Sequence, residues 1–409
     1  MERHYGMDWL RIGAFALLIL YHIGMVFVPW GFQVKTVHPA AWVEIPMLLT
    51  NPWRLTLLFV VSGYASRALL SRSPTVGAFL KSRNARLLIP LAFGIAVIVP
   101  PQTWVEVASQ HGYAHGFAWF YGHDYFRFGT LFGIVMPTWN HLWFVLYLWV
   151  YTVALCALAM IPGADRLQRT FDIVFAGSRA LWVPLAFLLV TQFWLFHRAE
   201  DTHDLFHDGV AHLQYFPALL FGFGLAGSRA VLGGLSHHWR LSSALAVASY
   251  ATIAGLLIAY PDFSFPTHAV TTVFRLAREI EAWSAIAALI GIAERFLNRD
   301  NAWRPMLAEA TFPFYIIHQT IIVLVEYWLL PLHIGAVAEF AILVPATIAG
   351  CWAFYLIGRE IGWLRPMIGL KRVAKSRVSA TAPGHGRSTD MDAGDPRWSR
   401  RDRAQPDVA

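Results

Sequence analysis

Two ionisable residues share one face of the first long apolar run of the sequence. Arg11 and His22 are eleven residues apart, and eleven helical steps of 100° make three turns plus about 20°, so both side chains project from one stripe roughly 16 Å apart. Arg11 lies near the start of the run, where it either extends to the headgroups, pairs with Asp8 or assists chemistry. For His22, about 20 Å into the run, we favour a general base over a histidine that only hydrogen-bonds a neighbour.

A second histidine lies at a matching depth in a later run. That run begins near Met306, and twelve residues at 1.5 Å each place His318 at about the height of His22. Two imidazoles at one depth suggest one shared cavity, in which both act as catalytic residues. The alternative for His318 is a core histidine with a satisfied hydrogen bond.

Two further sets of charged residues are candidates for substrate binding. Arg83 and Arg86 stand one helical turn apart just before the third apolar run. Each guanidinium can donate two parallel hydrogen bonds to a phosphate, although arginines at such a position also serve as topology signals. At the outer end of the eighth run, Arg275 and Glu281 belong to a cluster that either forms buried ion pairs or binds a polar acceptor.

The composition shows which environment positions these residues. Of 409 residues, 57% are hydrophobic and only 14% are charged, with a mean hydropathy of +0.48, whereas about a quarter of the residues in soluble domains are charged. The net charge of +7 falls in short clusters between apolar runs, which argues against a nucleic-acid surface. The two cysteines, Cys156 and Cys351, lack metal-ligand spacing, so we expect no metal site.

The apolar runs predict an all-α, polytopic membrane helix bundle of about ten transmembrane helices. The runs begin near Trp9, Pro52, Leu87, Leu142, Ala180, Leu213, Leu241, Ile280, Met306 and Ala336. Arginine and lysine concentrate in the connections after the second, fourth, sixth and eighth runs, and this bias predicts that both termini are cytoplasmic.

One segment follows this bundle of residues 1–370, and another connects two of its runs. From 371 to 409 the chain is basic and polar and rich in Ser, Gly, Pro and Asp, which predicts a disordered cytoplasmic tail whose basic start contacts membrane lipids. The connection from Ser109 to Asn140 is unusually aromatic. It forms either an interfacial helix or lid, or an aromatic belt that anchors the adjacent helices.

Five short motifs resemble those of the membrane acyltransferase-3 family, in particular its branch containing glucan-biosynthesis protein C. They occur in the family's order along the chain. The motifs are Met7 to Arg11 followed by Tyr21 and His22, Leu58 to Tyr64, Arg83 to Pro90, His141 to Val145, and Phe314 to His318.

The resemblance implies a bacterial inner-membrane enzyme that transfers an acyl group from cytoplasmic acyl-CoA to a hydroxyl of an extracytoplasmic glycan or similar acceptor. It implies that His22 is the catalytic histidine, that Arg11 is its partner, and that Arg83 with Arg86 holds the phosphates of the donor. No bound cofactor is implied, since acyl-CoA is a substrate. Many family members end the tenth span with Tyr, Glu and a nearby Pro, whereas Glu360 is here followed by Gly362, so no role is assigned to Glu360.

A secondary transporter is the main alternative from another class. In that case His22, His318, Arg275 and Glu281 would be proton or substrate sites near the middle of the membrane. Helices broken by Gly or Pro at corresponding positions of the two halves would favour it. Prolines interrupt the third run, and no matching break is evident in the second half.

Overall fold

A computed structural model describes residues 4–195, 202 and 204–372 of the chain. Residues Met1–Arg372 make up one unit. The predicted tail, apart from Lys371 and Arg372, lies outside the described residues.

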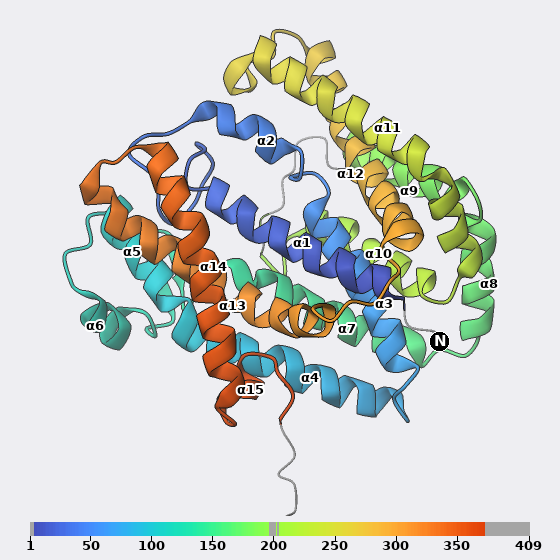
Figure 1. The fold of residues 1–409 in the computed structure, drawn as a ribbon, viewed down its shortest axis with the longest axis horizontal. Helices are drawn as coiled ribbons and strands as arrows, with labels where there is room; N and C mark the ends of the chain where they lie inside the picture. The colour runs from blue at the N-terminus through green and yellow to red at the C-terminus, as the bar shows by residue number, and fades with distance from the viewer. Residues whose placement is uncertain (1–3, 196–201, 203, 373–409) are drawn as a thin grey trace, which may run out of the picture. The chain divides into compact units, whose positions relative to one another are not determined.

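The described chain is almost entirely helical, as predicted (Figure 1). The helices are α1 (Tyr5–Gly24), α2 (Glu44–Leu48), α3 (Arg54–Leu70), α4 (Val76–Phe93), α5 (Pro100–Gln110), α6 (Phe117–Trp119), α7 (Trp143–Ala159), α8 (Ala164–Phe175), α9 (Arg179–Val190), α10 (Gly209–Leu225), α11 (Arg229–Ala259), α12 (His268–Phe296), α13 (Arg304–Leu329), α14 (Ala336–Glu360) and α15 (Leu364–Met367). Short 3₁₀ or π segments are η1 (Ala41–Val43), η2 (Gly94–Ile98), η3 (Phe120–Asp124), η4 (Asn140–Leu142), η5 (Thr191–Leu195), η6 (Pro261–Phe263) and η7 (Leu330–Leu332). Strands β1 (Gly129–Leu131) and β2 (Ile134–Met136) form one antiparallel hairpin.

The helices include several that are long and apolar enough to cross a membrane. Among the described residues six meet this test, and a seventh is obtained if α8 and the segment beginning at α9, bent by 91°, count as one span. Helix α10 is apolar but shorter. Each of the ten predicted runs lies on a helix, but the count of ten spans and the cytoplasmic placement of the termini stay predictions.

The prolines of the third run do not divide it into separate candidate spans. Helix α4 contains Pro90 and continues through the π segment η2 into α5, so that residues 76–110 form a single candidate span. Pro100 stands at the first position of α5, where its missing N–H is least costly.

Close helix contacts in the bundle depend on small residues. Helices α3 and α10 pack together, and a Cβ atom on Gly63 would lie 1.9 Å from the carbonyl oxygen of Leu219. Reciprocally, a Cβ on Gly222 would lie 1.8 Å from the carbonyl oxygen of Val60. Glycine at both positions therefore allows the two backbones to touch, as in other membrane helix pairs.

The long aromatic connection folds into a small unit with its own core. It contains α6, η3 and the β1–β2 hairpin, and Phe120, Tyr125 and Met136 are buried there against Val107 of α5. The hydroxyl of Tyr125 lies 2.8 Å from the carbonyl oxygen of Ile95 in η2. These contacts hold the connection against the α4–α5 span rather than leaving it as an extended loop.

Candidate active site

The two histidines predicted to lie at one depth are in direct contact. Helices α1 and α13 pack together, and Nδ1 of His22 lies 2.7 Å from Nε2 of His318. The two rings stack with their centroids 4.9 Å apart. His318 is fully buried, whereas His22 is partly exposed.

The hydrogen bonds of the pair determine which nitrogens carry protons when both rings are neutral. Nδ1 of His318 lies 2.7 Å from the carbonyl oxygen of Tyr315; because a carbonyl only accepts, this nitrogen is the donor. Nε2 of His318 is then an acceptor, so Nδ1 of His22 donates to it. Nε2 of His22 is left with a lone pair, which is the state a general base requires.

A third histidine, His141 of η4, completes the cluster. Its ring centroid lies 5.1 Å from that of His318, and its Nε2 donates to the carbonyl oxygen of Ile316 at 3.0 Å. Its Nδ1 is buried and has no hydrogen-bond partner among the described residues. His141 therefore offers a second lone pair near His22.

These groups line a cavity of about 380 Å³. It is large enough for part of a small-molecule substrate, and its wall mixes polar groups with aromatic rings. The polar lining consists of Tyr21, His22, Gln33, Arg54, Thr138, Asn140, His141, Thr202, Tyr315 and Gln319, and the aromatic rings include Phe32, Trp139, Trp143 and Phe144.

The segment after α1 folds over this cavity and is fixed by Lys35. Its ammonium donates to the carbonyl oxygens of Met25 and Val28, each at 2.6 Å. Burial lowers the pKa of Lys35 to about 8, so the side chain is still mostly protonated at pH 7. The bonds position Gln33, whose side-chain oxygen accepts a hydrogen bond from Gln319 at 2.9 Å.

Arg54, at the start of α3, is a cavity residue that the sequence reasoning did not single out. It is buried, its guanidinium lies 3.4 Å from the ring centroid of Tyr21, and its Nη1 donates to the carbonyl oxygen of Asn51. Its charge acts on His22. The signal that was overlooked is the position of this arginine at the predicted outer end of a span. Arginines concentrate in the cytoplasmic connections, so that bias does not explain one at the outer end.

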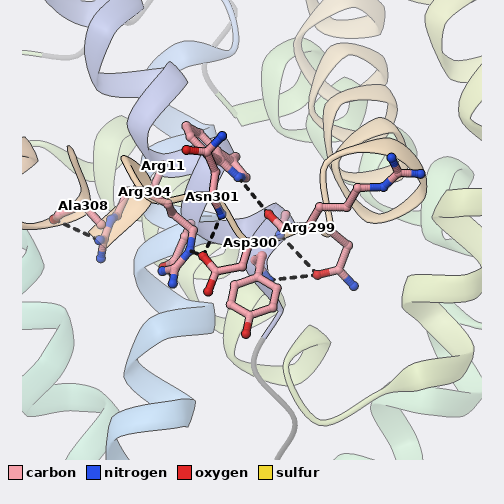
Figure 2. A network of polar contacts seen from close by, with 11 residues as sticks. Arg11, Arg299, Asp300, Asn301, Arg304 and Ala308 are labelled. Carbon is pink, nitrogen blue, oxygen red and sulfur yellow. Dashed lines mark hydrogen bonds and ion pairs between the residues drawn. The ribbon is translucent and has the colours of Figure 1, made fainter. Parts of the chain in front are cut away.

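Arg11 is held at the other end of α1. Its Nη2 donates to the carbonyl oxygen of Ala308 on α13 at 3.1 Å (Figure 2). Nearby, Arg304 binds Asp300 at 2.7 Å (Figure 2), and it also binds Asp8 at 2.7 Å. These bonds fasten the start of α1 to the start of α13, the same two helices that carry the histidine pair.

The remaining predicted site residues lie away from the histidine cavity. Arg83 is buried on α4, and its Nε and Nη2 find no partner in the described part of the chain. Neither Arg83 nor Arg86 is among the residues that line the cavity.

The α12 cluster does not line the cavity either, and no salt bridge within the described residues joins Arg275 to Glu281. Glu281 is 1% exposed, and both of its carboxylate oxygens lack a hydrogen-bond partner among those residues. Arg278 instead reaches Asn51, whose amide binds the hydroxyl of Tyr21 in the cavity wall.

Comparison with known proteins identifies the family. A family model described as an acyltransferase domain, that of the acyltransferase-3 family, matches residues 4–356. The chain belongs to this family. The membership predicted from the five motifs is therefore confirmed, and the protein is an acyl-transferring enzyme with the apolar helices of a multi-pass membrane protein.

The chain is similar to glucans biosynthesis protein C of Escherichia coli O139:H28 (strain E24377A / ETEC) and of Escherichia coli O9:H4 (strain HS). Each relative is 22% identical over 329 residues, which cover 78% of this chain and 81% of the relative. No solved structure matches the chain.

Three of the five motifs that indicated the acyltransferase family supply the histidine cluster. His22, His141 and His318 belong to different motifs and different helical segments, α1, η4 and α13. The fold thus brings together residues separated by up to 296 positions. The motif around Gly63 instead maintains the α3–α10 contact.

Proposed function

We propose that this protein moves an acyl group from cytoplasmic acyl-CoA to a hydroxyl of an extracytoplasmic glycan or similar acceptor. The observation that carries the proposal is the His22–His318 pair beside a polar cavity. Family membership supports the transfer reaction, and the name of the relatives, glucans biosynthesis protein C, supports a glycan as the acceptor. We place the protein in the inner membrane of a bacterium.

In the proposed reaction, Nε2 of His22 removes the proton of the acceptor hydroxyl. The oxygen attacks the thioester carbonyl, so that a C–O bond forms and the C–S bond then breaks. The imidazolium of His22 returns its proton to the departing sulfur of CoA. Atoms and charges balance, and the products are an ester and a thiol.

The neighbours of His22 have separate roles in this step. His318 accepts from Nδ1 of His22 and thereby keeps Nε2 free and oriented, as the third member of a catalytic triad does. The positive charge of Arg54, on the cavity wall, suits it to stabilise the oxyanion of the tetrahedral intermediate. The lone pair on Nδ1 of His141 suits it to accept a hydrogen bond from a second hydroxyl of the acceptor.

The donor is proposed to bind through its phosphates at Arg83 and Arg86. Buried guanidinium nitrogens without partners at Arg83 support an anionic ligand, because a buried charge is normally paired. Cysteine labelling tests the side of the membrane: a cysteine replacing Lys81 should react only with reagent added from the cytoplasm. Labelling from outside would contradict the donor site, since acyl-CoA is cytosolic.

Transfer by the purified protein tests the function directly. The protein in nanodiscs is incubated with labelled acyl-CoA and a glycan acceptor, and ester formation is measured. His22→Gln should lower turnover by about two to four orders of magnitude, because the amide can hydrogen-bond but does not titrate near neutral pH. Wild-type-like transfer by this variant would refute the mechanism. Solute or proton uptake by proteoliposomes without ester formation would instead favour a secondary transporter.

A further inference from the structure

Helix α15 packs on α4 at one end of the bundle (Figure 1), and Glu309 of α13 lies there near Arg365 and Arg86. Its Oε1 is 3.6 Å from Nη2 of Arg365, and its Oε2 accepts a hydrogen bond from the hydroxyl of Tyr355 at 3.4 Å. Arg86 is close enough for its charge to interact with that of Glu309. Glu309 therefore pairs with the guanidinium group of Arg365 on α15 and is near enough to interact with the charge of Arg86 on α4.

Arg365 is fixed so that one side of its guanidinium faces this position. Nη1 donates to the carbonyl oxygen of Arg359 at 2.6 Å, and Nε donates to that of Lys371 at 2.7 Å. The side chain is only 14% exposed. The bonds to two carbonyl groups leave Nη2 directed to Glu309, so Arg365 is preorganised to bind an anion there.

The positive charge of this region exceeds what Glu309 neutralises. Arg83 is one turn from Arg86 on α4, and the two charges act on each other. Arg83 is 9% exposed, and its Nε and Nη2 have no partner within the described chain. Within the described chain Glu309 is the carboxylate that acts on Arg86 and Arg365, and Arg83 forms no recorded ion pair, so an anion with more than one charge would balance the three guanidinium groups better.

We propose that Arg365 completes a phosphate-binding site with Arg83 and Arg86, and that Glu309 occupies the place of the phosphate when the site is empty. The inference rests on the proposed function, in which the phosphates belong to acyl-CoA. The Glu309–Arg365 pair is suited to displacement, because its separation of 3.6 Å is long for a charge-assisted hydrogen bond and the Glu309 side chain is 42% exposed. A phosphate with nearly two negative charges outcompetes one carboxylate. After transfer, Glu309 competes with the same phosphates on CoA and promotes its release.

Glu309→Gln tests the competition while keeping an acceptor for Tyr355. Binding of coenzyme A is measured by calorimetry on the full-length protein in phosphatidylcholine nanodiscs. Removing the competing charge should tighten binding about three- to fivefold, and the gain should shrink at high salt. Glu360→Gln is the matched control: Glu360 is 77% exposed and pairs with Arg359 at 3.3 Å, so its loss should leave the affinity unchanged. Arg365→Ala should weaken binding about tenfold or more.

Unchanged or weaker binding of coenzyme A by Glu309→Gln, relative to Glu360→Gln, would overturn the proposal. Phosphate groups also occur on anionic lipids, so the measurement is repeated with phosphatidylglycerol in the discs. If Glu309→Gln still binds coenzyme A more tightly than the wild-type protein in these discs, and Arg365→Ala still binds it more weakly, the nucleotide phosphates are supported as the ligand. Loss of coenzyme A binding in these discs would identify a lipid headgroup site and overturn the donor assignment. A different result would overturn the proposed function alone: the wild-type protein and its variants bind coenzyme A as expected, but the wild-type protein forms no ester.

Discussion

His318 offers the sharpest test of the active-site geometry, because in the proposed mechanism it acts on the substrate only through His22. Replacing His318 by Ala removes the acceptor that lies 2.7 Å from Nδ1 of His22. A hydrogen bond contributes about 0.5–1.5 kcal/mol when both groups are neutral and about 1.5–3 kcal/mol when one is charged. His22 becomes charged in the transition state, so the lost bond costs about 1–1.5 kcal/mol more there, or roughly five- to fifteenfold in kcat.

Loss of orientation increases this effect. Without His318, the His22 ring is free to rotate and to move its proton to Nε2, the nitrogen that has to accept one. We therefore expect His318→Ala to lower kcat by about 10- to 100-fold, while the KM for acyl-CoA stays unchanged because the arginines of α4 do not line the histidine cavity. The measurement is single-turnover transfer from labelled acyl-CoA in nanodiscs, normalised to folded protein.

His318→Gln distinguishes positioning from packing. Its amide oxygen can accept from His22 near the position of Nε2, and the side chain still fills most of the buried space. This variant should recover to within about tenfold of the wild-type kcat. Equal loss in the Ala and Gln variants, or no loss in the Ala variant, would refute the proposed proton arrangement of the pair.

Three further predictions test other parts of the structure. His141→Phe should raise the acceptor KM about two- to tenfold through one lost hydrogen bond, with a smaller change in kcat, and an effect only on the donor KM would contradict the assigned role. Arg83→Ala combined with Arg86→Ala should raise the donor KM by one to several orders of magnitude; an unchanged KM would leave the pair as a topology signal. Gly63→Ala should destabilise the protein by about 1–3 kcal/mol in thermal unfolding, whereas Gly233→Ala, which meets no atom within 4 Å, should not.

Depth along a helix was the part of the site that the sequence determined best. The rise of 1.5 Å per residue placed His22 and His318 at one height, and the structure brings their rings into contact. That α1 packs against α13 does not follow from this calculation, since many helices reach the same depth. Arg54 was overlooked, and His141 was noted only as part of a family motif, for the same reason: both stand at the beginning of a span, and their cavity is formed only when segments far apart in the sequence meet.

Charged helices limit what hydropathy alone predicts about the spans. Helix α12 is 29 residues long but is not among the six helices that qualify by composition, and it carries Arg275, Arg278, Glu279 and Glu281. Its buried positions face protein, since α11 packs along it. A helix covered by its neighbours tolerates charges that lipid would penalise. The apolarity of such a helix is therefore a weaker indicator of whether it crosses the membrane.

The spacing between Arg11 and His22 has a structural reason that only the paired helices reveal. Arg11 contacts Ala308 and His22 contacts His318, so the two contacts are eleven residues apart on α1 and ten residues apart on α13. At 1.5 Å per residue the intervals are roughly 16 Å and 15 Å, which requires α1 and α13 to run in the same direction in a nearly constant register. A shift of α1 by one residue would move Nδ1 of His22 about 1.5 Å along its axis and rotate it by 100°, enough to break a bond of 2.7 Å. We therefore propose that Arg11 supports catalysis at a distance of three helical turns, by holding the register in which His22 meets His318.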